Sequence, residues 1–361
     1  MIYSDSPRPS MDPLPSSASI SSILTSASYQ SLIGTSTSTE TLVLEARNNL
    51  DSHKTELQEL VGASTCYAFL LSMLEYAPTP LGQRHVACVV LQTDDDIAAL
   101  SKCAVDWYHF LVFLVREADK TGCYEPIFDF SNTRTLTYKE YMKEVDNSPR
   151  RTKTLRKQAC NLLLRDNDRC IISGSIDIGS KNPTKESSTP LQISHIIPWS
   201  LNNLYGMTEV AKTGTWDMLQ NFVGIDIAKF PGGEINHPSN AFLSTLTAAL
   251  MFSSFMIYFD STDTPHKYIV RTFYKNEFAN RTVTFRDHSG SKGPISLPDP
   301  DLLAVQGAFA KVINASGAAA EPDQLWDELV LPGLGFKSAQ VRSQSLLSQV
   351  KSSPLITNQM T

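Results

Sequence analysis

One long stretch without a charged residue limits the folds that this chain can adopt. Residues Ala241 to Phe259 read AFLSTLTAALMFSSFMIYF, which is long enough to cross a lipid bilayer as a helix. However, serine and threonine recur within it, basic residues flank neither end, and Asp260 and Asp263 follow closely, none of which is typical of a membrane helix. A buried core helix that runs into a strand at Phe255–Phe259 fits the stretch at least as well, and a membrane anchor is the less favoured alternative.

The overall composition is that of a globular protein. A chain of 361 residues suffices for one large or two ordinary domains with a sizeable core. The net charge of −6 excludes a generally basic nucleic-acid coat, so contact with DNA or RNA would have to come from a local patch. The six cysteines form no Cys-x-x-Cys pair, and a zinc ribbon or thioredoxin-like site is therefore not expected. The polar start, Met1 to Leu14, is unlike a secretory signal, which favours an intracellular protein of the nucleus or cytoplasm.

Four regions differ in composition. Residues 1–40 are rich in Ser, Thr and Pro, which predicts a disordered leader. Residues 41–148 show apolar positions at helical spacing, which predicts a mainly helical region whose role the sequence does not reveal. Residues 149–321 mix short strands with helices, and residues 322–361 form a polar C-terminal tail. The sequence therefore predicts an α+β protein with a helical N-terminal region.

Several individual elements can be predicted within these regions. The run His85–Gln92 is β-branched and short, so it fits either a strand or a buried helical turn, whereas Ile97–Ala118 is predicted to be a helix. Further predictions are strands at Cys170–Ile172, Gln192–Ile197, Met256–Asp260, Tyr268–Tyr274 and Thr282–Arg286, and a helix at Leu302–Ala315. The last three strands are expected to form an antiparallel meander.

The strongest cluster of positive charge lies between Pro149 and Lys157. Such a cluster is typical of an arm that contacts phosphates or of a nuclear-import sequence, and the alternative is the solvated face of a helix. It stands just before an apolar helical segment at Leu162–Leu164, which slightly favours a role in nucleic-acid binding. The candidate binding residues are Arg150, Arg151, Lys153, Arg156 and Lys157.

Three short motifs follow this cluster in a fixed order. The first is Arg165-Asp-Asn-Asp-Arg-Cys-Ile-Ile-Ser-Gly, the second is Ser194-His-Ile-Ile-Pro, and the third is Asn236-His-Pro-Ser-Asn. Their order resembles the HNH endonuclease module, and most of all the fungal group of HNH-domain proteins, over residues 155 to 321. The resemblance implies a ββα-metal core with added short antiparallel strands, in which a histidine on a strand activates water and a divalent metal, Mg²⁺ or Mn²⁺, stabilises the phosphate.

Carried over residue by residue, the resemblance implies His195 as the general base and Asn240 as the amide that orients its ring. Apolar neighbours Ile193 and Ile196 fit an extended strand that presents His195 on the opposite face. The metal-ligand histidine of the family maps to Ala249, which cannot coordinate a metal, and His237 is a weak substitute.

The residue before the base, a second metal ligand in many HNH enzymes, is Ser194, and a neutral hydroxyl is a poorer ligand for a hard cation than a carboxylate. Two main hypotheses remain. One is a metal-dependent nuclease of DNA or RNA with weakened or lost activity, and the other is a degenerate HNH module that binds nucleic acid or protein without cutting. The sequence does not indicate the oligomeric state.

Overall fold

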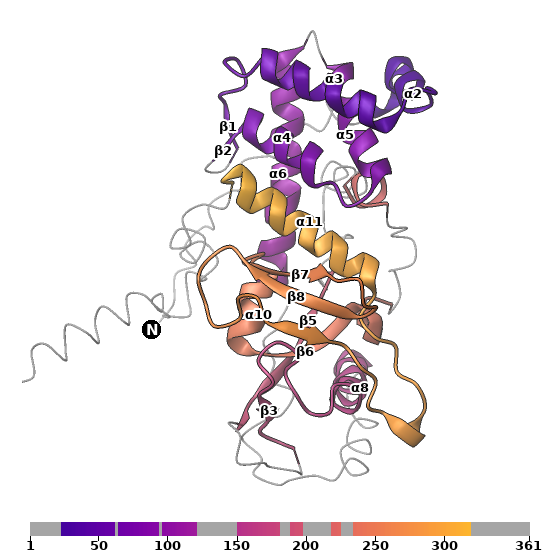
Figure 1. Cartoon of the computed structure of the whole chain (residues 1–361), viewed down its shortest axis with the longest axis vertical. Coiled ribbons are helices and arrows are strands. Elements are labelled where there is room, and N and C mark those ends of the chain that lie inside the picture. Colours follow the sequence, from indigo (N-terminus) through magenta and orange to yellow (C-terminus); the bar gives the residue numbers. More distant parts are fainter. Residues whose placement is uncertain are drawn as a thin grey trace, which may run out of the picture.

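The computed structural model describes residues 23–61, 64–93, 96–120, 150–180, 188–197, 218–224 and 234–318. The protein is a mixed α+β protein with small sheets, as the sequence predicts. Helices from the N-terminal half gather at one end with the short strands that precede α4 (Cys66–Tyr76), the strands of the C-terminal half with helices α8 (Arg150–Arg165) and α10 (Leu246–Ser253) lie at the other, and helix α11 (Pro300–Ser316) runs between them (Figure 1). Residues 121–148, the last part of the predicted helical region, and the predicted polar tail of residues 322–361 fall outside the described residues.

Five helices build the N-terminal end: α2 (Ala27–Ile33), α3 (Thr39–Ser52), α4 (Cys66–Tyr76), α5 (Pro80–Gln92) and α6 (Ile97–Lys120). Strands β1 (Leu60–Val61) and β2 (Ser64–Thr65) form a short antiparallel pair before α4. Ser or Thr side chains cap the first turns of α2 to α5 by accepting a backbone N–H, which satisfies donors that a helix leaves free. The run at His85–Gln92 is thus helical, and the predicted helix at Ile97–Ala118 is confirmed.

Helix α2 corrects the predicted extent of the disordered leader. It lies within residues 1–40, its Tyr29 is buried, and the Tyr29 hydroxyl lies 2.7 Å from Nδ1 of His85 on α5. The buried Arg84 donates to four carbonyl oxygens at the end of α2 and in the following turn, from Leu32, Ile33, Thr35 and Thr37. A cation at the carbonyl end of a helix is favourable, so long-range contacts stabilise a segment of low apolar content.

The C-terminal half contains two separate antiparallel arrangements. Strand β5 (Leu191–His195) pairs with β6 (Ala241–Thr245), which leads into α10 (Leu246–Ser253). Strands β7 (Ile257–Ser261), β8 (Lys267–Thr272) and β9 (Thr282–Thr284) form the predicted meander. The remaining elements are α8 (Arg150–Arg165), the parallel pair β3 (Ile176–Asp177) and β4 (Ser188–Thr189), the π-helix η2 (Met218–Phe222), the 3-10 helices η4 (Glu234–Asn236), η5 (Pro238–Asn240) and η6 (Gly290–Lys292), and α11 (Pro300–Ser316).

The uncharged stretch of residues 241–259 is not one helix. It divides into strand β6, helix α10 and the start of strand β7. In the described residues, no helix has both the length and the apolar character that a membrane crossing requires. A second correction concerns Cys170–Ile172, where a turn that ends at Gly174 (φ +80°) replaces the predicted strand, and only Arg169 and Ile176 form an isolated bridge.

Helix α11 joins the two ends of the molecule into one core. It packs against α4 on one side and against β7 on the other. Gln306 donates to the backbone carbonyls of Phe252 and Ile257, and Asn314 donates to that of Phe255, which has a positive φ of 56°. These amides satisfy backbone groups in the connection from α10 to β7, and α11 thereby fixes the position of α10.

Candidate functional site

The site predicted from the sequence lies on the β5–β6 pair and the helix that follows it. In the register of the pair, His195 is opposite Ala241, and Ser194 is opposite Phe242. The hydroxyl of Thr245 caps α10 by accepting the N–H of Ala248, so the helix begins directly where β6 ends. Helix α10 packs back against β5 and β6. The chain therefore forms a strand–strand–helix unit with His195 at the end of its first strand.

One face of the strand pair is covered by α10. Phe242 contacts Phe252 of α10 in an edge-to-face arrangement, with ring centroids 5.0 Å apart. Ser194 is on the same face, because its hydroxyl lies 2.5 Å from that of Ser244 across the pair. Ala249 is buried and stands one turn before Phe252, on the side of α10 that packs against the strands. This layer is filled by a hydroxyl pair and aromatic rings.

His195 belongs to the other face of the pair, since successive side chains of a strand alternate. Ile193 shares that face, so the predicted placement of His195 opposite both isoleucines is wrong for Ile193. Both ring nitrogens of His195 are shielded from solvent, and burial lowers the pKa of the imidazole from 6.5 to about 4, an effect that the Asn236 side chain partly offsets. The ring is therefore neutral at pH 7.

Asn240 holds together the two chain segments that flank His195. Its Oδ1 accepts the N–H of Ile197 at 2.8 Å, while its Nδ2 donates to the carbonyl oxygens of Ile197 and Ile235, both at 3.0 Å. Its backbone carbonyl accepts the N–H of Ile196 at 2.9 Å. Asn240 is almost fully buried, and these backbone contacts are the ones that it makes among the described residues. It therefore holds the segment that follows β5 against the segment that precedes β6.

A buried ion pair supports the same unit from α8. Arg165, the last residue of α8, pairs with Asp166 at 2.7 Å and donates to the carbonyl oxygens of Pro238, Ala241 and Ser296. Asp166 accepts the N–H of Leu243 on β6 at 3.0 Å. Burial raises the pKa of Asp166, and the Arg165 guanidinium opposes that shift. Both residues belong to the first motif, and their structural role was not predicted, although a charged pair directly after three leucines could have indicated it.

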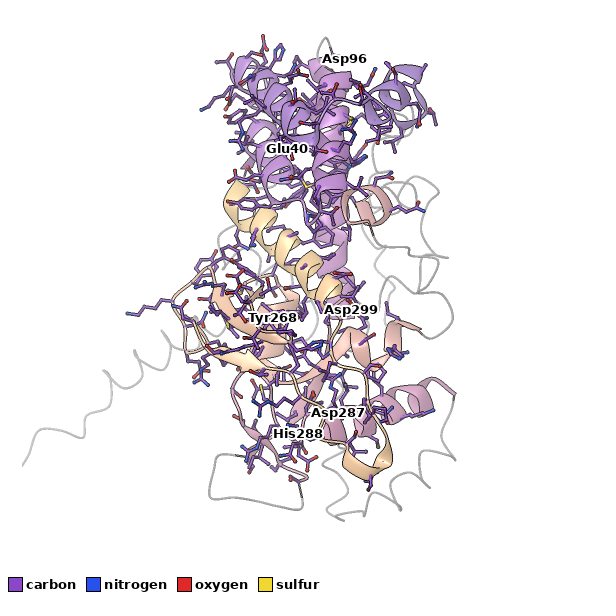
Figure 2. The ribbon with its side chains drawn as sticks, turned by 45° about the vertical axis from the view of Figure 1, so that its right-hand side comes forward. Glu40, Asp96, Tyr268, Asp287, His288 and Asp299 are labelled. Carbon is purple, nitrogen blue, oxygen red and sulfur yellow. The ribbon has the colours of Figure 1, made fainter. Side chains whose placement is uncertain are left out.

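Contacts from the C-terminal segments complete the surroundings. The His288 N–H donates to the carbonyl of Arg165 at 3.1 Å, and Figure 2 shows Asp287 and His288 together at the end of the molecule that holds α8. The N–H of Asp299, the N-cap of α11, donates to the carbonyl of Ser239 at 2.9 Å. The beginning of α11 is thereby tied to the 3-10 helix that contains Asn240.

The residues present do not fit the divalent metal that the resemblance implies. Ala249 offers no donor atom, and the Ser194 hydroxyl is already bonded to that of Ser244. The substitute His237 is exposed, and its Nδ1 caps η5 by accepting the N–H of Ser239. Asp260 pairs with Arg271 at 3.0 Å on the meander. Within the described ranges, no three His, Cys, Asp or Glu side chains come together as a metal site would require.

The candidate nucleic-acid-binding residues all lie on α8. The helix spans Arg150–Arg165, and of the five basic residues only Lys157 has a described side chain, which is exposed. The C-terminal half of α8 is buried and packs against β5, β6 and the two 3-10 helices around Asn240. The backbone of the basic segment is therefore continuous with a helix that is fixed to the strand–strand–helix unit.

The neutral state of His195 predicts a pH dependence of stability. The unfolded chain takes up a proton on this ring below pH 6.5, whereas the folded protein resists protonation until about pH 4. The contribution is complete above pH 6.5 and is lost as the pH falls towards 4, by up to roughly 3 kcal/mol. Urea unfolding of the wild type and His195→Asn at pH 7, 5.5 and 4.5 should therefore give a stability difference that shrinks with acidity.

This comparison isolates His195 from other buried groups. Burial raises the pKa values of Asp166 and Asp177, so their protonation favours the folded state as the pH falls, which is the opposite sign. Both aspartates are present in both proteins, so their effects cancel in the difference. Parallel stability curves for the two proteins across this pH range would contradict a buried neutral His195.

Comparisons of this chain with protein-family models, with curated proteins and with solved structures found no match.

Proposed function

We propose that the chain contains an HNH-like ββα module that has lost its metal site and binds the sugar-phosphate backbone of DNA or RNA without cutting it. The observation that carries the proposal is the unit β5–β6–α10, with His195 at the end of the first strand and Asn240 clamping the entry to the second. The order strand–strand–helix is the one that the resemblance implies, whereas Asn240 binds backbone groups and not the ring of His195.

The packing between the strands and α10 supports the loss of metal-dependent cleavage. The two positions that would supply metal ligands, Ser194 and Ala249, both belong to the layer between β5–β6 and α10. That layer contains a bonded hydroxyl pair and the contact of Phe242 with Phe252. Charge stabilisation is usually the largest single contribution to such catalysis, so a module without ligands is expected to lose several orders of magnitude in rate.

The basic segment of α8 supports nucleic acid as the partner. All five of its basic residues fall within about two turns of helix, Arg150 to Lys157, in a protein whose net charge is negative. Lys and Arg that neutralise phosphates release counterions, and this makes binding strongly dependent on salt. Because α8 packs on the ββα unit, a backbone held by α8 would lie against that unit and not on a separate arm.

The binding test uses the full-length protein and fluorescently labelled DNA and RNA, each as single strand and duplex. A variant in which Arg150, Arg151, Arg156 and Lys157 are changed to Gln should bind at least about tenfold more weakly at low salt, with a shallower salt dependence. The matched control changes four exposed basic residues elsewhere, Lys54, Lys275, Arg286 and Lys292, and alters the net charge by the same amount. Fluorescence anisotropy over a range of salt concentrations measures the binding affinity and its dependence on salt.

Equal losses in the two variants would show that only the net charge matters and would contradict a binding role for α8. Absence of any binding by the wild type would overturn the nucleic-acid proposal itself. Circular dichroism spectra and thermal midpoints of the variants distinguish lost binding from lost folding.

A further inference from the structure

Two side chains near the end of β5 contain buried polar atoms that have no hydrogen-bond partner among the described residues. They are His195, with both ring nitrogens, and Asn236, with its Oδ1. The chain segments that carry them are held together by Asn240, which binds the backbone of Ile235 and of Ile197, and the Asn236 side chain raises the pKa of the ring against the effect of burial. A buried polar atom without a partner costs about 1–3 kcal/mol, so their proximity calls for a specific explanation.

We propose that Asn236 is the positioning residue of His195: its Oδ1 accepts the N–H of the imidazole and selects one tautomer. This hydrogen bond would satisfy one buried atom on each residue. The second ring nitrogen then carries a lone pair, which is the form that can accept a proton or a hydrogen bond from a bound group.

The backbone around the two residues is arranged to keep them together. Asn240 binds the carbonyl of Ile235, directly before Asn236, and also binds the N–H and the carbonyl of Ile197, two residues after His195. One side chain thus connects the segments that carry the imidazole and its proposed partner. Asn240 acts on His195 through the backbone, whereas Asn236 acts on the ring itself.

This division of roles differs from the one that the sequence suggests, in which Asn240 orients the ring. The amide of Asn240 is occupied by three backbone groups, while the Oδ1 of Asn236 is buried and has no hydrogen bond among the described residues. The inference does not rest on the proposed function. The orientation of a buried imidazole can be measured whether or not the protein binds or cuts nucleic acid.

The test is nuclear magnetic resonance of the full-length protein labelled with ¹⁵N in its histidines. Two variants at one position should act in opposite directions. Asn236→Leu removes the acceptor, so the pKa of His195 should fall further and the ¹⁵N shifts should lose their tautomer preference. Asn236→Asp keeps an acceptor and adds a negative charge, so the pKa should rise by at least about one unit.

His237 serves as the internal control, because it is exposed and adjacent to the substituted residue, and its ¹⁵N shifts should change less than those of His195 in Asn236→Leu. If Asn236→Leu does not fold, the rise in the pKa of His195 in Asn236→Asp is sufficient to test the proposal. An unchanged pKa and unchanged tautomer of His195 in Asn236→Asp would overturn the proposal. Nucleic-acid binding measured on the same samples shows separately whether the proposed function holds.

Discussion

Replacing Arg165 with methionine is expected to lower the free energy of unfolding by about 3–5 kcal/mol, the cost of breaking a buried ion pair by removing one partner. The guanidinium is fully buried, pairs with Asp166 at 2.7 Å and serves the carbonyl oxygens of Pro238, Ala241 and Ser296. Without it, Asp166 would remain as an uncompensated charge next to β6, and three carbonyls would lose a donor. Chemical denaturation of the purified variant measures the loss.

A second Arg–Asp pair in the same molecule provides the control. Arg271 and Asp260 pair at 3.0 Å on β8 and β7, but their side chains are 40% and 37% exposed. Exposed pairs contribute about 1 kcal/mol or less, so Arg271→Met should have a small effect. Similar decreases in the free energy of unfolding for Arg165→Met and Arg271→Met would contradict the role assigned to Arg165.

Replacing Gly82 with alanine is expected to destabilise the protein by about 3 kcal/mol or more, although alanine favours a helix over glycine. Gly82 lies in the first turns of α5, and a methyl group there would collide with the backbone carbonyl of Phe222 in η2. A backbone carbonyl cannot rotate away as a flexible side chain can. Accommodation would require η2 to move from α5, which would break one of the contacts between the N-terminal helices and the C-terminal half.

Gly307 offers the matched control because it is also a buried helical glycine, in α11. A methyl group there would meet its nearest neighbour, a ring carbon of Tyr258, at 3.4 Å, the edge of ordinary van der Waals contact. Gly307→Ala should therefore be neutral or stabilising by up to about 1 kcal/mol. Thermal or urea unfolding measures the change in stability of each variant. Changes of the same sign and size in Gly82→Ala and Gly307→Ala would contradict the collision expected at Gly82.

Where the sequence shows a periodic pattern, it predicted the fold well. The β7–β8–β9 meander alternates buried and more exposed residues, the pattern of a half-buried strand, and α6 and α11 show apolar residues at helical spacing. The run of residues 241–245 has no such alternation, because four of its five residues are buried on both faces of the pair. Its strand conformation depends on pairing with β5, about fifty residues earlier, which no local pattern contains.

Long-range contacts also explain the other corrections. Helix α2 has a serine-rich sequence, and its order depends on Arg84 and His85 of α5. At the candidate site, too, the sequence indicates some features, and others depend on long-range contacts. The motif order placed His195 on a strand and singled out Asn240, whereas the proposed pairing of Asn236 with the ring depends on the position of the 3-10 helix η4 that carries it. A single asparagine in a polar loop gives no sign of this in the sequence.

The central proposal is that the β5–β6–α10 unit is an HNH-like module without metal-dependent cleavage. The most direct measurement is nicking of supercoiled plasmid and cleavage of labelled RNA by the purified full-length protein with Mg²⁺ or Mn²⁺, compared with His195→Ala. We predict that neither protein cuts either substrate, while the wild type binds nucleic acid through α8. Metal-dependent cleavage by the wild type that disappears in His195→Ala would contradict the account.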